Sequence, residues 1–279
     1  TAQIVALGTD QIGAIQDDGI ETLSTAQFAA METADFALFS KKQIASISTD
    51  NFNALTTAQI EALTTAQAGY ITAEQLGALT TGQLTAIATD DLVALADKQI
   101  QALTTGSIAA LTTAQAAGLA SRQLGAMSTA QIEALTTASV AALATDTVAA
   151  LPSKTLQALT TGQLGALATD QIEALTVKQV GYLTTAQIAG LDTADLNALT
   201  TAQMAALTEK QVQALTTAQV SSLTTDDLTA LTSKQLNAMT TEAVASLTTA
   251  QIVALTTEQF AKLDVEQISA MTTAQVAAI

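Results

Sequence analysis

An eight-residue repeat runs through the whole chain, and it limits the folds open to this protein more than any other feature. Every eighth residue from Leu7 to Ile279 is Leu, Ile, Met or Phe, in 35 positions without an insertion or deletion. A second register, from Ile4 to Val276, is almost as strictly apolar. Such periodicity is typical of a repeat architecture and not of an ordinary globular core. We therefore expect residues 1–279 to form a single continuous octapeptide-repeat solenoid.

The two apolar registers lie three residues apart within each octad, which favours helix over strand. One continuous helix does not suit the repeat, because eight residues advance about 800° at 3.6 residues per turn. The apolar stripe would drift about 80° per octad and would never form one face. The sequence therefore predicts an all-α fold in which a new, very short helix begins in every octad.

The residues that restart each helix are visible in Leu55-Thr56-Thr57-Ala58-Gln59-Ile60. With Thr56 as the N-cap, Gln59 stands at the third helical position and completes a capping box. Leu55 and Ile60 then occupy the positions of a hydrophobic staple. Gln fills 24 of the 35 places in this register, so we expect the same capping in most octads.

Two residues that can cap a helix stand at the start of most octads. The second residue of the pair could therefore replace the first as the N-cap. Where the first Thr is replaced, as at Ala88, the next residue, Thr89, has a hydroxyl that could cap. We therefore expect Thr57 to take over when Thr56 is lost.

A longer period is superimposed on the octad and appears in the basic residues. They form two series in which successive members are seven octads apart: Lys42, Lys98, Lys154 and Lys210, and then Arg122, Lys178 and Lys234. When the two series are read together, the separations between neighbouring cations from Lys98 to Lys234 alternate between three and four octads. This alternation keeps a residue on one face when each turn holds about 3.5 units, as in coiled-coil heptads.

We thus predict about 3.5 octads per coil and a stripe of these seven cations along one side. Lys154 should lie near Arg122 and Lys178, with Asp146 and Asp170 as partners. The alternative is that the seven-octad period is a duplication unit without geometric meaning.

The composition excludes several classes of function. Cys and His are absent, which removes thiol chemistry, the usual transition-metal ligands and the commonest general base. A net charge of −16 disfavours nucleic-acid partners, and no apolar run approaches the about 20 residues of a membrane span. We expect no enzyme, no catalytic residue, no cofactor, no metal, no nucleic acid and no membrane insertion.

The L-T-T-A-Q-I-x-A octads, taken together, resemble the octapeptide repeat tracts of large bacterial surface and secreted proteins. The resemblance covers all 279 residues. It implies an extracellular or cell-surface location and no catalytic residues. An adhesin or stalk, or an ice-binding surface built from the regular Thr pairs, is the alternative to a purely structural role.

Both ends of the chain lie inside the repeat, without polar capping octads. Ile4 and Leu7 at one end, and Val276 and Ile279 at the other, are expected to leave the core open to water. Complementary open ends make a heterologous contact that propagates into a filament unless it closes. The length is one residue short of five of the seven-octad periods, so a second copy would continue the octad almost in phase. We therefore expect a structural rod that assembles head to tail with itself into a filament.

Overall fold

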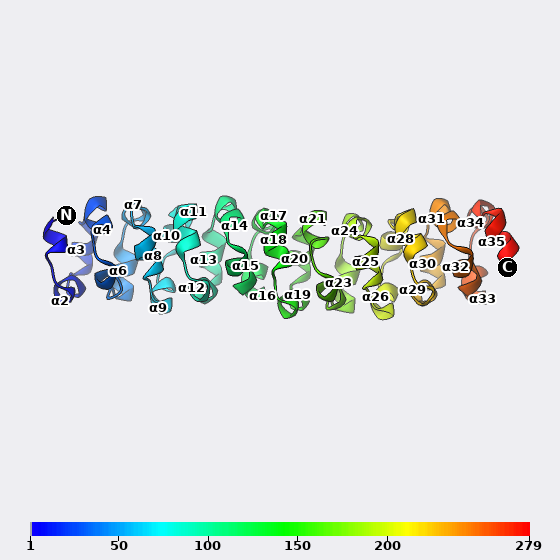
Figure 1. Cartoon of the computed structure of the whole chain (residues 1–279), viewed down its shortest axis with the longest axis horizontal. Coiled ribbons are helices and arrows are strands. Elements are labelled where there is room, and N and C mark those ends of the chain that lie inside the picture. The colour runs from blue at the N-terminus through cyan, green and yellow to red at the C-terminus, as the bar shows by residue number, and fades with distance from the viewer. Residues whose placement is uncertain (1) are drawn as a thin grey trace. The chain divides into compact units, whose positions relative to one another are not determined.

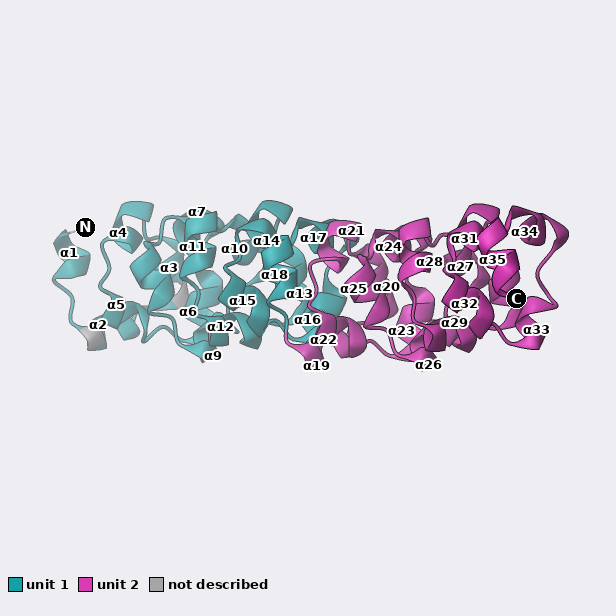
Figure 2. Cartoon of the chain, turned by 45° about the vertical axis from the view of Figure 1, so that its right-hand side comes forward, with its two compact units in different colours: residues 1–143 teal, residues 144–279 magenta. Residues whose placement is uncertain are grey.

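A computed structural model describes residues 2–279, with the backbone alone for Thr9 and Asp17. Over this range the chain forms 35 short helices and no strand (Figure 1). The predicted all-α class, with one very short helix per octad, is confirmed. The chain divides into two compact units, the first reaching Leu143 and the second spanning Ala144–Ile279 (Figure 2). The octad register continues through this boundary without an insertion.

The helices of unit 1 are α1 (Ala2–Val5), α2 (Thr9–Gly13), α3 (Asp17–Glu21), α4 (Thr25–Ala29), α5 (Thr33–Phe36), α6 (Lys41–Ser46), α7 (Thr49–Asn53), α8 (Thr57–Glu61), α9 (Thr65–Ala68), α10 (Ala73–Ala78), α11 (Thr81–Ala86), α12 (Thr89–Ala94), α13 (Asp97–Ala102), α14 (Thr105–Ala110), α15 (Thr113–Gly118), α16 (Ser121–Ala126), α17 (Thr129–Ala134) and α18 (Thr137–Ala141). Those of unit 2 are α19 (Thr145–Ala149), α20 (Ser153–Ala158), α21 (Thr161–Leu164), α22 (Thr169–Glu173), α23 (Val177–Tyr182), α24 (Thr185–Gly190), α25 (Thr193–Asn197), α26 (Thr201–Ala205), α27 (Glu209–Gln213), α28 (Thr217–Ser222), α29 (Thr225–Ala230), α30 (Ser233–Asn237), α31 (Thr241–Ser246), α32 (Thr249–Ala254), α33 (Thr257–Phe260), α34 (Val265–Ala270) and α35 (Thr273–Ala278).

The helix α8 illustrates how each octad starts its helix. Thr56 is the N-cap in an extended conformation, and its hydroxyl accepts a hydrogen bond from the Gln59 backbone N–H at 3.2 Å. In return, the Oε1 atom of Gln59 accepts from the Thr56 backbone N–H at 2.8 Å. The predicted capping box is therefore present, and two backbone donors of the first turn are satisfied.

The expectation that the second residue of the pair takes over the cap is wrong. Ala88 and Ala96 stand at the N-cap positions of α12 and α13, and neither helix has a side-chain cap. Thr89 and Asp97 are the first helical residues, one position too late to cap. The helix start stays in register because each octad must present its apolar residues to the same core.

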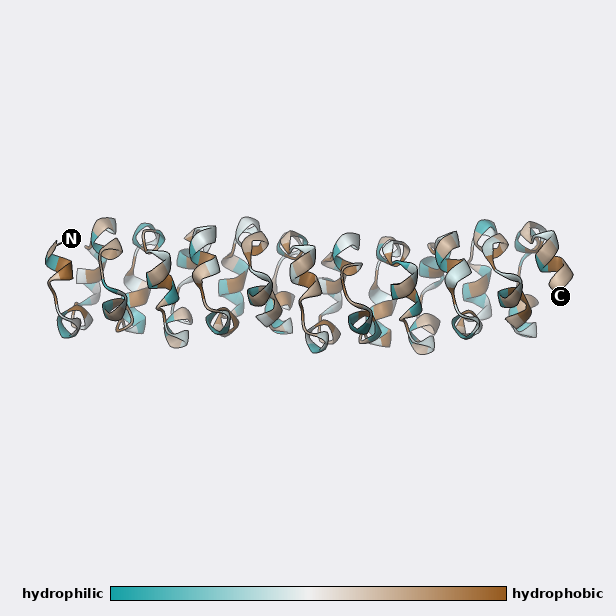
Figure 3. Cartoon of the chain, viewed as in Figure 1, coloured by the Kyte–Doolittle hydropathy of each residue, from teal (hydrophilic) through white to brown (hydrophobic). Residues whose placement is uncertain are grey.

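The core consists of the two apolar registers found in the sequence. In α8 and the residues that follow it, Ile60 is 1% and Leu63 6% exposed. The variable fifth residue of the octad, here Glu61, is exposed. Hydrophobic and hydrophilic segments therefore alternate within each short helix (Figure 3). The predicted burial of both registers is confirmed through most of the chain.

Successive coils are joined by contacts between helices three and four places apart. Within each unit a helix contacts the third helix along the chain, as in α10 with α13 and α28 with α31. Side-chain hydrogen bonds also link residues that are 28 positions apart, which places them in octads four places apart along the chain. A coil therefore holds between three and four octads, in agreement with the predicted value of about 3.5.

Candidate functional site: the contact between successive coils

The third residue of the octad, usually Gln, makes the polar contacts between coils. While the Oε1 atom of Gln59 completes the capping box of its own helix, its Nε2 atom points to the preceding coil. There it donates to the Phe28 carbonyl at 2.7 Å and to the Met31 carbonyl at 2.8 Å. The Phe28 carbonyl lies in the last turn of α4 and also accepts from the Met31 backbone N–H at 3.1 Å, and the Met31 carbonyl lies just beyond the helix. One side chain thus caps the start of one helix and the end of another.

The same amide link recurs along both units. In each case the Nε2 atom donates to the carbonyl of the residue that precedes it by 28 positions, and the donors are Gln43, Gln59, Gln67, Gln75, Gln83, Gln99, Gln115, Gln123, Gln131, Gln179, Gln187, Gln203, Gln211, Gln219, Gln235, Gln251, Gln259, Gln267 and Gln275. All of these glutamines are buried, so leaving either partner unpaired would cost about 1–3 kcal/mol. These bonds supply direction as well as stability, because every coil donates toward the preceding one.

The exceptions in this register show what the link requires. Asn51 has a shorter side chain, and its Nδ2 atom still reaches the Leu23 carbonyl at 2.7 Å. Asp91 and Asp195 are buried at the same octad position, 5% and 7% exposed, but an ionised carboxylate has no hydrogen to donate. Burial raises the pKa of Asp195, and the neighbouring Asp192 raises it further.

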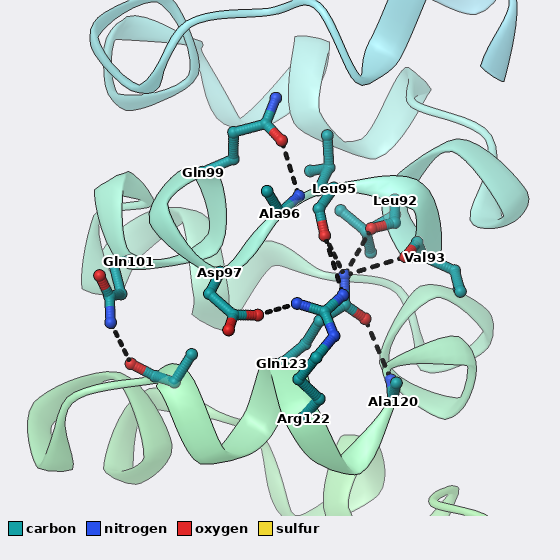
Figure 4. A network of polar contacts seen from close by, with 11 residues as sticks. Leu92, Val93, Leu95, Ala96, Asp97, Gln99, Gln101, Ala120, Arg122 and Gln123 are labelled. Carbon is teal, nitrogen blue, oxygen red and sulfur yellow. Dashed lines mark hydrogen bonds and ion pairs between the residues drawn. The ribbon is translucent and has the colours of Figure 1, made fainter. Parts of the chain in front are cut away.

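The network around Arg122 combines the amide link with an ion pair (Figure 4). Gln123 donates to the carbonyls of Leu92, at 3.0 Å, and Leu95, at 3.1 Å. The guanidinium of Arg122 donates to the Leu95 carbonyl as well, at 3.3 Å, and pairs with the carboxylate of Asp97. Residues from α16 therefore contact both the end of α12 and the start of α13.

The sequence reasoning assigned Gln a capping role and missed its bonds between coils. One signal could have revealed them. A capping box accepts Glu as readily as Gln at its third helical position, yet no Glu occurs in the register from Gln3 to Gln275. Capping alone does not explain that absence. A demand for the amide N–H group favours Gln over Glu at most of these positions, although aspartates such as Asp91 and Asp195 are accepted at some of them.

The structure places all seven cations of the expected stripe at the surface, each as the second residue of its helix. Three pairs lie on helices that contact each other: Lys98 with Arg122, Lys154 with Lys178, and Lys210 with Lys234. Lys42 lies beside Lys41 on α6, which contacts α3.

Among the described residues one anionic partner is shown, and it is not among those expected. Arg122 pairs with Asp97, which the spacing argument did not select. Asp170 accepts a hydrogen bond from the Thr145 hydroxyl at 3.3 Å. Arg122 belongs to unit 1 and Lys154 to unit 2. Their expected proximity therefore stays a prediction, and the continuous stripe of cations stays one too.

The four residues expected to open the core at the ends differ in exposure. Ile4 is 5% exposed and Leu7 is half-buried. Val276 and Ile279 are 57% and 68% exposed. Ile279 also lines a hollow together with Ile252, Leu255, Phe260 and Ala278.

The comparison with known families agrees with this repeat architecture. The family described as the ALTTAQ repeat matches residues 28–65, 44–81, 117–153, 148–185, 156–193, 188–225 and 222–257. These matches together cover more than half of the chain. The chain belongs to the ALTTAQ-repeat family. The predicted resemblance to a repeat tract is therefore confirmed, while its setting in bacterial surface proteins stays a prediction. A search of curated proteins found no match.

The coil contact of this ALTTAQ-repeat chain is built from amides, hydroxyls and carbonyls. Within residues 2–279, no group of three or more His, Cys, Asp or Glu side chains could hold a metal ion. None of the described helices is long and apolar enough to cross a membrane. The chemistry that the arrangement offers is non-covalent: burial of Leu and Ile, and hydrogen bonds that run in one direction from coil to coil.

Proposed function

We propose that this ALTTAQ-repeat chain is a structural protein that assembles head to tail with itself into a filament, outside a bacterial cell or on its surface. The observation that carries the proposal is the polarity of the coil contact. Each coil presents amide donors toward the preceding coil and carbonyl acceptors toward the following one. Two such faces are complementary, and a heterologous contact of this kind propagates.

The donor face at the start of the chain supports the proposal. Gln3 and Gln11 are exposed, whereas Gln59 and Gln123, at the same octad position, are 1% and 0% exposed. Gln59 donates to the Phe28 and Met31 carbonyls of the preceding coil. Gln3 and Gln11 would need equivalent carbonyls from another coil. We propose that a second copy of this chain supplies this coil.

The opposite face supports the same occupant. Ile268 and Val276 are 45% and 57% exposed, although they belong to the register in which Val220 and Val244 are 0% exposed. A further coil stacked there would cover them as the internal coils are covered. The first coil of a second copy offers both the apolar side chains and the amide donors that this face lacks. The net charge of −16 disfavours a nucleic-acid partner, and we propose no enzymatic activity.

Charge placed on the last coil should block assembly. We expect Ile268→Asp combined with Val276→Asp to remain monomeric at concentrations where the unmodified chain grows, because the new carboxylates would be buried at the contact. The measurement is light scattering across a concentration series, with filament length by electron microscopy. Val177→Asp is the matched control, because Val177 is 48% exposed and lies away from both coil ends.

The outcomes separate clearly. A chain that stays monomeric at high concentration would overturn the proposal. Equal assembly by the double variant and the control would show that other surfaces join the copies.

A further inference from the structure

The cations of unit 2 gather on two neighbouring rows of helices. Because a coil holds about 3.5 octads, helices seven places apart return to the same side. Lys154 and Lys210 lie on α20 and α27, and Lys178 and Lys234 lie on α23 and α30. The rows are adjacent, since α20 contacts α23 and α27 contacts α30. All four side chains are exposed, and we call them the cationic rows.

The helix dipole does not explain this placement, and only Lys178 of the four has a local aromatic contact, with its Nζ atom 5.8 Å from the centroid of the Tyr182 ring. Each of these lysines is in the first turn of its helix, where the positive end of the helix dipole disfavours a cation. The neighbouring rows also bring like charges together: Lys210 and Lys234 line one hollow, with Glu209 beside them. Glu258 of the same chain lines a second hollow with Lys234, and an anionic group from outside that lies against the rows would relieve the remaining repulsion.

An acidic row with the same repeat lies on another side of unit 2. Asp170 and Asp226 are both exposed and lie on α22 and α29, seven helices apart, as are the helices that carry Lys178 and Lys234. The helices α19 and α26 form the row in between, since α19 contacts α22 and α23 contacts α26. The acidic row therefore repeats every two coils, in step with the cationic rows, but faces a different direction.

We propose that unit 2 binds a second copy of this chain side by side, with its cationic rows against the acidic row of that copy. The equal repeat allows successive pairs to form in register, so that weak individual contacts act together. This sideways contact is separate from the head-to-tail contact proposed above and would gather filaments into bundles.

Charge exchange tests the pairing while it keeps the net charge. Lys178→Glu with Lys234→Glu, or Asp170→Lys with Asp226→Lys, should each weaken side-by-side association at least tenfold. The variant that combines all four changes keeps the net charge of −16 and should recover it. We would measure particle width by electron microscopy and association by sedimentation at about 50 mM salt, where charges about 10 Å apart are little screened. Circular dichroism checks that each variant is folded.

The readouts keep the two contacts apart, because head-to-tail growth changes length and sideways pairing changes width. The chain with Ile268→Asp and Val276→Asp should still form side-by-side pairs. Failure of the four-fold variant to recover, or widths that do not respond to either reversal, would overturn the sideways contact. Neither result would affect the head-to-tail proposal.

Discussion

At the scale of the residue, the third-position Gln has two jobs that depend on different atoms. In Gln219, the Oε1 atom accepts from the Thr216 backbone N–H at 2.8 Å. Its Nε2 atom donates to the carbonyls of Ile188 and Leu191, both at 2.8 Å. Capping needs only an acceptor, and the coil contact needs only a donor. Substitutions at this position can therefore remove one function and keep the other.

We expect Gln219→Glu to keep the cap and lose the coil contact. The carboxylate still accepts at Thr216, but it meets two carbonyl oxygens in a site that is 2% exposed. The free energy of unfolding should fall by about 1–3 kcal/mol, measured by urea denaturation. Gln213→Glu, at an exposed position, makes the same charge change and should cost little. Equal losses in both variants would contradict the role assigned to the amide.

Asp195 provides the reciprocal change and a pH dependence. Because burial, and then Asp192, raise its pKa, the folded state favours the protonated form. Asp195 therefore contributes most stability below the ordinary pKa of an aspartate, and this contribution is lost as the pH rises through the raised value. Asp170 and Glu173 lie on α22, which contacts the helix α25 that carries Asp195.

We expect Asp195→Asn to stabilise unit 2 by about 1 kcal/mol at pH 7, because the new amide can donate as Asn51 does. The advantage should shrink at about pH 3, where the carboxyl of the unmodified chain is protonated and can donate too. Urea midpoints of both proteins across this range are the measurement. A constant difference at every pH would mean that protonation of Asp195 is not the cause.

At the scale of the element, each helix begins at one fixed residue of the octad. Thr56 accepts from the Gln59 backbone, whereas Thr57 is the first helical residue. The helices α12 and α13 keep the same start although their N-caps are Ala88 and Ala96. In α13 the backbone N–H of Ala96 still donates to Gln99 at 2.7 Å. Half of the capping box is therefore sufficient when the coil contacts are intact.

The two threonines should respond differently to substitution. Thr56→Ala is expected to lower the free energy of unfolding by about 1 kcal/mol through loss of the cap. Thr57→Ala should have almost no effect, and the double variant should match Thr56→Ala. Thermal and urea unfolding of the three variants check this. A double variant that is much less stable than Thr56→Ala would restore a capping role for Thr57.

At the scale of the whole molecule, each unit is held together by contacts between neighbouring coils. The hydrogen bonds between coils join residues 25 to 31 positions apart, so no contact of this kind depends on distant parts of the chain. Stability in such solenoids is close to a sum over repeats and their neighbours. The length of a unit should therefore be adjustable in whole octads.

Deletions within unit 2 test this additivity. Removing residues 201–256 takes out seven whole octads and joins Thr200 to Thr257 in register. The shortened chain should fold, with a smaller free energy of unfolding. Removing residues 201–252 joins Thr200 to Val253 and shifts the register by half an octad, which would turn apolar residues outward. We expect circular dichroism to show a clear loss of helix and cooperativity for the second deletion alone.

The amino-acid sequence by itself determined the features that arise within one octad. The apolar registers, the short helices, the capping box at Thr56 and Gln59, and the coil of about 3.5 octads all follow from spacing and from interactions three residues apart. The helix start is local only where a cap is present, because at Ala88 and Ala96 the common core holds the same start without a side-chain cap.

The tertiary structure decided everything that links residues from different coils. It brought Gln59 to Phe28 and Met31, and Arg122 to Asp97. These contacts depend on the rotation and rise from one octad to the next, which set the residues that meet across a coil boundary. The rotation follows from the period of about 3.5 octads, but the rise comes from how Leu and Ile side chains fill the core, and no spacing along the chain specifies it.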